Sequence, residues 1–367
     1  MFDIGRSKRA EQAFGFDDIA IVPSRRTRGE EEVSLAWRID AATFRFPLIA
    51  APMDSVMSPA TAVQMGQLGG LGVLNLEGLW TRYDDPEPLF EEIAAVQDPI
   101  AATRKLQQLY SAPIREELIG KRIASIREAG VPAAGALSPQ NTQEYAQAVV
   151  DSGVDFFVIR GATVSAEHVS AARAPLNLKQ FIYELDVPVI VGGCATYQTA
   201  LHLMRTGAAG VLVGFGGGSA STTRSVLGVA VPMASAVSDV AAARRDYLDE
   251  SGGRYVHVIA DGSVGNSGDI AKAIACGADA VMVGSPLAKA EEAPGRGYHW
   301  GPEAWHASLP RGERTHHGVV GTLEQILLGP SSVPDGTMNL VGALGKAMAT
   351  TGYTEVKEFQ RVEVVVG

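Results

Sequence analysis

Short apolar runs alternate with longer amphipathic segments along almost the whole chain. Each run holds five to seven residues, a length typical of buried strands rather than of helices. The longer segments carry apolar residues on one face, as helices on the surface of a globular protein do. Eight runs are predicted to form strands, and they begin at Pro47, Leu71, Val131, Asp155, Pro188, Gly210, Val256 and Ala280.

Four of the predicted helices have clear ends, because each opens on a serine or threonine and closes on a glycine. Ser and Thr cap helix N-termini, and Gly accepts the left-handed conformation that ends a helix. These segments are 58–69, 138–153, 196–207 and 267–277. A helix between successive strands indicates parallel βαβ units. Eight units without an obvious edge strand predict an α/β fold, a closed (β/α)8 TIM barrel, with an open doubly wound sheet as the alternative.

Two segments depart from this alternation within what we otherwise expect to be a single domain spanning residues 1–367. The segment 84–130 contains more predicted helix than one βα unit needs, so we expect a helical excursion there. The segment 293–318 is rich in Gly, Pro, Arg and aromatic residues and shows no regular period. It follows the eighth strand, where barrel enzymes place lids, and is predicted to be an irregular, lid-like loop.

The composition restricts the possible partners and location. Of the 367 residues, 46% are hydrophobic and 20% are charged, as in ordinary soluble globular proteins. A net charge of −10 argues against a nucleic-acid partner, which requires clustered Lys and Arg. No apolar run approaches membrane-spanning length and the first residues lack a signal-peptide core, so we expect no membrane partner. Two cysteines do not make a disulfide framework, and we expect a cytoplasmic location.

The predicted ends of strands six, seven and eight lead into glycine- and serine-rich loops that indicate a phosphate site. The sixth strand runs into GFGGGSASTTR, where three successive glycines allow backbone N–H groups to converge on an anion. Ser219 and Ser285 add hydroxyl donors at two of these ends. Asp261 ends the seventh strand and could accept two hydrogen bonds from a ribose diol. Because barrel active sites form at the carboxyl ends of the strands, the sequence predicts a nucleotide site there.

Several motifs occur in the order found in one superfamily. GFGGGSASTTR is followed by VPMASAVSDVA and IADGSVGNSGDIAKAIACGADAVMVGSPLA; FDDIAIVP, APMDSV and GGLGVLN precede it, and GALGKAMATTGY comes near the C-terminus. This collinear set resembles the IMP dehydrogenase and GMP reductase superfamily over nearly the whole chain. The stretch NLEGLWTRY is most similar to the actinobacterial IMP-dehydrogenase-like paralogues that lack regulatory domains. The segment 84–130 is too short for regulatory domains of the cystathionine-β-synthase type, so we expect none.

The resemblance implies a binding site for a purine nucleoside monophosphate at the barrel mouth. It assigns phosphate contacts to Ser219, Ser285 and Tyr298, and a ribose contact to Asp261. Met53 would pack against the base, although an ordinary core position is the alternative. The expected substrate-binding residues are Met53, Gly216, Gly218, Ser219, Asp261, Gly262, Gly284, Ser285 and Tyr298.

At the catalytic position the chain departs from the pattern that it resembles. The family uses a loop cysteine to attack the purine; this cysteine aligns with Ser221, and Thr223 is the second predicted catalytic residue. A serine hydroxyl needs a neighbouring general base, and the loop contains no histidine. We expect Cys276 to be buried in a helix, and Cys194, after the fifth strand, remains a minor alternative nucleophile.

Other positions that the resemblance implies for catalysis are replaced as well. Arg160 and Gly161 end the fourth strand, where the family has an aspartate for the nicotinamide nucleotide, so they are the predicted NAD contacts. The family's Arg-Tyr pair is missing between 301 and 318, where the candidates are Arg311, Arg314, His316 and His317, expected in a solvated loop. The resemblance also implies a potassium ion in the catalytic loop and a homotetramer.

Three functions are compatible with this pattern. The first is NAD-dependent oxidation of IMP to XMP in GMP biosynthesis, or a related redox reaction. The second is a catalytically inactive purine-nucleotide sensor or partner subunit. The third is an FMN-dependent barrel oxidoreductase, since FMN uses the same two phosphate loops. They predict IMP-dependent NADH formation, nucleotide binding without turnover and a yellow protein, respectively.

Overall fold

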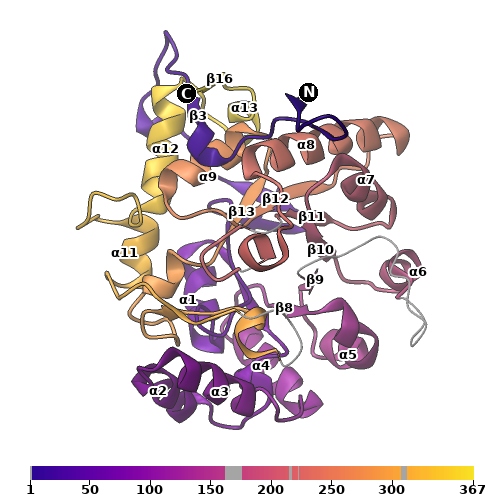
Figure 1. Cartoon of the computed structure of the whole chain (residues 1–367), viewed down its shortest axis with the longest axis vertical. Coiled ribbons are helices and arrows are strands. Elements are labelled where there is room, and N and C mark those ends of the chain that lie inside the picture. Colours follow the sequence, from indigo (N-terminus) through magenta and orange to yellow (C-terminus); the bar gives the residue numbers. More distant parts are fainter. Residues whose placement is uncertain (1, 162–175, 215–216, 222, 307–311) are drawn as a thin grey trace.

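The computed structural model of the chain describes residues 2–161, 176–214, 217–221, 223–306 and 312–367 (Figure 1). Eight parallel strands pair side by side into a closed barrel. In ring order they are β6 (Leu48–Ala50), β7 (Leu71–Asn75), β8 (Ala134–Leu137), β9 (Phe156–Arg160), β10 (Val189–Cys194), β11 (Gly210–Val213), β12 (His257–Asp261) and β13 (Ala280–Val283). Each coincides with a predicted run, and β13 pairs with β6, so the ring has no edge. The barrel prediction is confirmed, and the open-sheet alternative is wrong.

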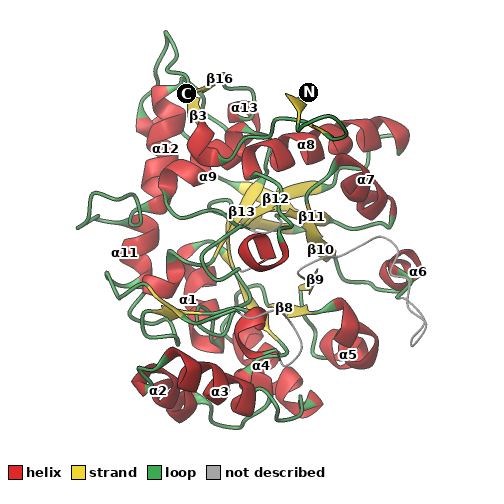
Figure 2. Ribbon diagram, in the orientation of Figure 1, coloured by secondary structure: helices red, strands yellow, loops and turns green. Residues whose placement is uncertain are grey.

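Helices surround the barrel, and most of them lie between successive strands (Figure 2). These helices are α1 (Pro59–Leu68), α4 (Glu116–Glu128), α5 (Pro139–Asp151), α6 (Leu178–Tyr183), α7 (Tyr197–Arg205), α8 (Met233–Glu250) and α9 (Ser267–Ala275). After the eighth strand, α12 (Leu340–Thr350) packs beside α9 in the outer layer. Within the described residues, no helix is both long and apolar enough to cross a membrane.

The helix ends show why these segments begin and stop where they do. Ser58 Oγ accepts a hydrogen bond from the Thr61 amide at 3.0 Å, and Gly69 ends α1 with a φ of 111°. The cap of α9 differs from the prediction, because Asn266, one residue before the predicted serine, accepts the Asp269 amide at 3.1 Å. An asparagine caps as well as a serine, so the helix still begins at the predicted place.

Between β7 and α4 the chain forms two additional helices, α2 (Glu87–Ala95) and α3 (Pro99–Leu109), where the sequence predicts surplus helix. They lie at the far end of the molecule from both termini (Figure 1). Helix α3 packs against α10 (Pro302–Trp305), and the ring of Tyr110 stacks on that of Trp305 with centroids 4.6 Å apart. The excursion therefore supports the segment that follows the eighth strand.

Short antiparallel strands lie in pairs outside the barrel, and one pair contacts its amino-terminal end. They pair as β1 (Phe2–Asp3) with β2 (Arg9–Ala10), β3 (Ile19–Ile21) with β16 (Val364–Val366), and β4 (Trp37–Ile39) with β5 (Ala42–Phe44). The rings of Trp37 and Phe44 stack 5.2 Å apart, and Trp37 Nε1 donates to Nδ1 of His257, 3.3 Å away, at the start of β12. Aromatic side chains thus close this end of the barrel. A binding site is therefore expected at the opposite end, where the strands have their carboxyl ends.

The segment 293–318 contains more regular structure than its composition predicts. Tyr298–His299 (β14) and Thr315–His316 (β15) pair as an antiparallel ribbon, with α10 between them. The rings of Tyr298 and His316 lie across the ribbon, with centroids 4.6 Å apart. The rest of the described segment is irregular, as its composition predicts, and cross-strand ring contacts of this kind stabilise the short ribbon within it. After the ribbon, the chain forms α11 (Leu323–Leu328), α12 and the short helix α13 (Val356–Phe359).

Candidate functional site

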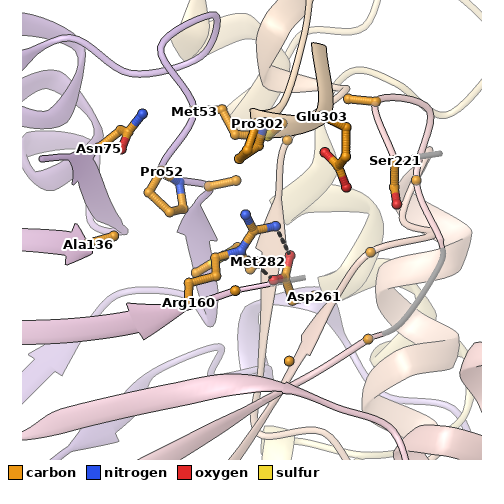
Figure 3. Close-up of a pocket in the computed structure, with 18 of the residues that line it drawn as sticks. Pro52, Met53, Asn75, Ala136, Arg160, Ser221, Asp261, Met282, Pro302 and Glu303 are labelled. Carbon is orange, nitrogen blue, oxygen red and sulfur yellow. Dashed lines mark hydrogen bonds and ion pairs between the residues drawn. The ribbon is translucent and has the colours of Figure 1, made fainter. Parts of the chain in front are cut away.

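A cavity of about 640 Å³ opens at the carboxyl ends of the barrel strands (Figure 3). Loops that follow β6, β9, β11, β12 and β13 all contribute to its wall. The predicted site residues that line it are Met53, Arg160, Gly161, Gly218, Ser219, Ser221, Thr223, Asp261, Gly262, Gly284 and Ser285. Gly216, which was also predicted, lies outside the described residues. The barrel therefore gathers residues that are far apart in the sequence into one wall.

Two serine hydroxyls from different loops meet in this wall. The Oγ atoms of Ser219, after β11, and Ser285, after β13, are 2.7 Å apart. Gly218 precedes the first serine with a φ of 92°, a conformation that favours glycine and lets the loop turn toward the second. Both hydroxyls can donate to the same acceptor, so the arrangement suits a small oxyanion such as a phosphate.

His317 stands beside the serine pair, although the sequence analysis expects it in a solvated loop. Its Nε2 atom lies 3.1 Å from Ser219 Oγ and 3.1 Å from Thr315 Oγ1. Burial, followed by the nearby charges of Lys289 and His316, lowers the pKa of His317. The imidazole is therefore neutral at pH 7 and can exchange a hydrogen bond with the serine hydroxyl. His317 is therefore half-buried beside Ser219 rather than fully solvated.

Asp261 and Arg160, which the sequence analysis assigns to different ligands, form one ion pair at the cavity floor (Figure 3). Arg160 Nε donates to Asp261 Oδ2 at 2.8 Å, and Nη2 donates to Oδ1 at 3.3 Å. Burial lowers the pKa of Arg160, but the neighbouring carboxylate outweighs this effect and raises it. The pair is charged, and part of the hydrogen-bonding capacity of Asp261 is already used by the protein.

Ser221 reaches the cavity, but the described residues supply no base that is hydrogen-bonded to its hydroxyl. Its Oγ donates to Thr223 Oγ1 at 3.4 Å, a long hydrogen bond between two neutral groups. Within the described part of the chain, no histidine or carboxylate is hydrogen-bonded to this oxygen. Glu303 also projects into the cavity (Figure 3). Without a bonded base the serine remains a weak nucleophile, as the sequence analysis expects.

Neither cysteine supplies the missing thiol. Cys194 is buried at the end of β10, where its Sγ donates to the Leu212 carbonyl at 3.4 Å. Burial raises the pKa of Cys194 to about 12 and that of Cys276, at the end of α9, to about 11. The sequence holds these two cysteines and neither lines the cavity, so no thiolate is available at the mouth. Cys194 is thereby removed as an alternative nucleophile.

A profile of the IMP dehydrogenase / GMP reductase domain matches residues 13–303. The chain belongs to the IMP dehydrogenase / GMP reductase family. It is 53% identical, over the whole length of both chains, to an uncharacterized oxidoreductase of Mycolicibacterium smegmatis. It is 31% identical to the inosine-5'-monophosphate dehydrogenase of Cryptosporidium parvum, over 79% of this chain and 71% of that one.

A solved structure in the same family has the same fold. The crystal structure of an IMP dehydrogenase/GMP reductase-like protein from Corynebacterium glutamicum matches with a TM-score of 0.95 and 50% identity. The match covers 100% of this chain and 97% of that one. The IMP dehydrogenase / GMP reductase family is therefore supported by sequence and by structure alike.

One residue that the family resemblance assigns to the phosphate does not reach the cavity. Tyr298 is absent from the described cavity wall, because its ring is held between Arg314 and His316. The Arg314 guanidinium lies 3.7 Å from the centre of that ring, and it donates to the carbonyls of Ile93 and Val96 at the C-terminal end of α2. Arg314 is therefore half-buried against the excursion rather than solvated, and the tyrosine fixes the ribbon. Arg311 lies outside the described residues.

Two buried groups that the sequence motifs do not single out are His299, in the cavity wall, and Asp54, which is not among the residues that line the cavity. His299 bonds to Ser55 Oγ through Nδ1 at 3.0 Å, and burial lowers its pKa to about 3. Asp54, the neighbour of Met53 in APMDSV, accepts from the Tyr110 hydroxyl at 2.6 Å. Asp54 could have been predicted from the sequence, because it lies within that motif. His299 could not, because the pairing of the ribbon strands brings it to the mouth.

Proposed function

We propose that the cavity binds a purine nucleoside monophosphate and holds its phosphate on Ser219 and Ser285. The single observation that supports this best is the 2.7 Å separation of the two hydroxyl oxygens, which come from different strand ends. A pair this close donates to one phosphate group, and the adjoining glycine loops allow close approach of the backbone. The cavity of about 640 Å³ has room for the rest of a nucleotide.

The ion pair on the cavity floor favours a ligand that is polar beyond its phosphate. A carboxylate has roughly four acceptor positions, and Arg160 fills two of those of Asp261, so a ribose diol could use the remainder. Arg160 has about three further N–H groups, which suit a carbonyl or anionic edge of the ligand. We therefore propose that Asp261 binds the ribose while it remains paired with Arg160.

The chemistry at the mouth favours binding over the oxidation of IMP. Covalent attack on a purine requires an activated nucleophile, and Ser221 has no bonded base among the described residues. The two thiols of the chain are elsewhere and protonated at neutral pH. We propose a nucleotide-binding protein of this family, a sensor or a partner subunit, in which IMP dehydrogenase activity is weak or absent.

NAD, one of the cofactors implied by the family, fits the described part of this site poorly. The predicted NAD contact at the end of β9 is a guanidinium turned toward Asp261, which suits an anion better than a ribose diol. The loop that would hold potassium includes Gly216 and Thr222, both outside the described residues. We therefore assign no reaction step to either group.

An FMN-dependent oxidoreductase is the second candidate. The mycobacterial relatives are named oxidoreductases, and FMN carries the same kind of phosphate as a nucleotide. The absorbance spectrum of the purified protein distinguishes the two proposals. A flavin spectrum after gel filtration would replace the purine nucleotide with FMN as the occupant of the serine pair.

Calorimetry with IMP and inosine tests the proposed phosphate site, because the two ligands differ only in the phosphate. We expect IMP to bind at least about tenfold more tightly than inosine, since hydrogen bonds to a charged group are worth about 1.5–3 kcal/mol. The double variant Ser219→Ala, Ser285→Ala should abolish that preference. Ser111→Ala, at an exposed serine whose Oγ donates to the Gln108 carbonyl, serves as the control. An unchanged preference in the double variant would contradict the proposal.

A further inference from the structure

A second cavity, of about 290 Å³, lies at the amino-terminal end of the barrel, opposite the mouth. Its walls come from α8, the residues before β12, the end of α9 and the C-terminal segment around α13. The lining residues are Ser238, Ala241, Arg244, Arg245, Leu248, Tyr255, Cys276, Gly277, Lys357, Gln360 and Arg361. None of them belongs to the nucleotide site, so this cavity needs an explanation of its own.

All the charged side chains that line this cavity are positive. Arg244 and Arg245 come from α8, and Lys357 and Arg361 come from the C-terminal segment. The chain as a whole has a net charge of −10, so the cluster runs against the overall charge. Like charges that face one cavity repel one another, and a concentration of them is usually balanced by an anion.

One carboxylate, Asp279, lies behind the cavity wall and cannot balance all four cations. Arg244 Nη1 donates to its Oδ2 at 2.7 Å, and the Tyr255 hydroxyl donates to its Oδ1 at 2.6 Å. Gln360 Nε2 and the Val258 amide donate to it as well, at 3.0 and 2.8 Å. Its hydrogen-bonding capacity is thus filled by the protein, and it neutralises about one positive charge.

Two of the remaining cations, Arg245 and Arg361, have no ion-pair partner among the described residues, and Lys357 shares Asp279 with Arg244. Lys357 lies 3.4 Å from Asp279, and its Nζ is 4.0 Å from the centre of the Tyr255 ring. Partial burial, together with Arg244 and Arg361, lowers the pKa of Lys357 to about 7. The guanidinium groups of Arg245 and Arg361 are therefore available to pair with an anion in the cavity.

We propose that this cavity binds a small phosphate-bearing molecule, at a site separate from the barrel mouth. Guanidinium groups present N–H donors in a planar fork that matches phosphate oxygens, and a lysine adds a point charge. Arg244 and Tyr255 are fixed in place by Asp279, so part of the site is already organised before a ligand arrives. A volume of about 290 Å³ limits the ligand to a small metabolite.

Titration calorimetry with inorganic phosphate at low ionic strength tests this site. The double variant Arg245→Gln, Arg361→Gln removes two exposed cations and leaves the buried Arg244–Asp279 pair intact. We expect it to weaken phosphate binding by about tenfold or more, because two guanidinium groups that would donate to the phosphate oxygens are lost. Arg25→Gln, Arg104→Gln removes the same charge at exposed positions elsewhere and should leave the affinity within about twofold.

The serine variants of the mouth separate this site from the proposed nucleotide site. If the proposal is right, phosphate binding that depends on Arg245 and Arg361 persists in the double variant of Ser219 and Ser285. Phosphate binding that is lost in the serine variant and unchanged in the arginine variant would overturn the proposal and leave the nucleotide site intact. Phosphate binding that survives both double variants unchanged would also overturn it.

Discussion

Two Arg–Asp pairs lie at opposite ends of the same barrel, and they differ in how completely the protein surrounds them. At the mouth, Arg160 and Asp261 are 2.8 Å apart with side chains 25% and 11% exposed. At the amino-terminal end, Arg244 and Asp279 are 2.7 Å apart with side chains 8% and 6% exposed. The distances are alike, so the difference lies in the surroundings.

The comparison shows which pair maintains the fold and which is available to a ligand. Asp279 accepts from Arg244, Tyr255, Gln360 and a backbone amide, so protein groups fill both of its oxygens. Within the described residues, the side-chain donor to Asp261 is Arg160. An incompletely surrounded ion pair in a cavity can exchange hydrogen bonds with a ligand, whereas a saturated pair only stabilises its neighbours.

Breaking the saturated pair should have the largest effect. Arg244→Ala leaves the Asp279 carboxylate buried without its strongest partner, and we expect a loss of about 3–5 kcal/mol in the free energy of unfolding. Urea denaturation measures this loss. A loss below about 1 kcal/mol would show that the remaining donors suffice and that the two pairs are equivalent.

Acid should lower the free energy of unfolding through His299, a buried residue at the mouth. Its folded pKa, about 3, lies below the ordinary value of 6.5, so the unfolded state binds the proton more readily. Stability therefore falls as the pH drops from 7 through 6.5 toward the folded pKa, by about 2 kcal/mol between pH 7 and pH 4.5. His299→Gln should remove this part of the pH dependence.

His257 provides the matched control at the other end of the barrel. Burial lowers its pKa, but the nearby Asp279 carboxylate opposes that shift. The variant His257→Gln should therefore flatten the pH dependence of unfolding less than His299→Gln does. Equal effects would mean that the two ends respond to acid alike.

Breaking the mouth pair should cost less than breaking the saturated one. Arg160→Ala leaves Asp261 with access to the cavity, and we expect a loss of about 1–2 kcal/mol in the free energy of unfolding. The same urea titration compares it directly with Arg244→Ala. A loss as large as that of Arg244→Ala would assign Arg160 to the fold and weaken its proposed role in binding.

Introducing a thiol at Ser221 should have the smallest effect of these changes. Ser221→Cys restores the family's thiol, but Arg160 still occupies the cavity floor and the Arg-Tyr pair is still missing from the described residues of 301–318. NADH formation from IMP and NAD should stay at the level of Ser221→Ala. Sustained IMP-dependent NADH formation would show that the other replacements matter little.

The barrel could be predicted from the sequence because its strands are local apolar runs and its helices have local caps. The serine loops were also predictable, since parallel strands place their carboxyl ends together. The Arg160–Asp261 ion pair could not be predicted. Its side chains come from β9 and β12, which are not neighbours in the barrel, and the length of the arginine side chain allows them to meet. The position of Tyr298 depends in the same way on a ribbon partner distant in the sequence.

The most direct test of the account is a crystal structure of the protein grown with IMP. We expect the phosphate within hydrogen-bonding distance of the Oγ atoms of both Ser219 and Ser285, with the ribose at Asp261 and the Arg160 pair retained. IMP bound at another place, or with its phosphate away from both serines, would contradict the central claim.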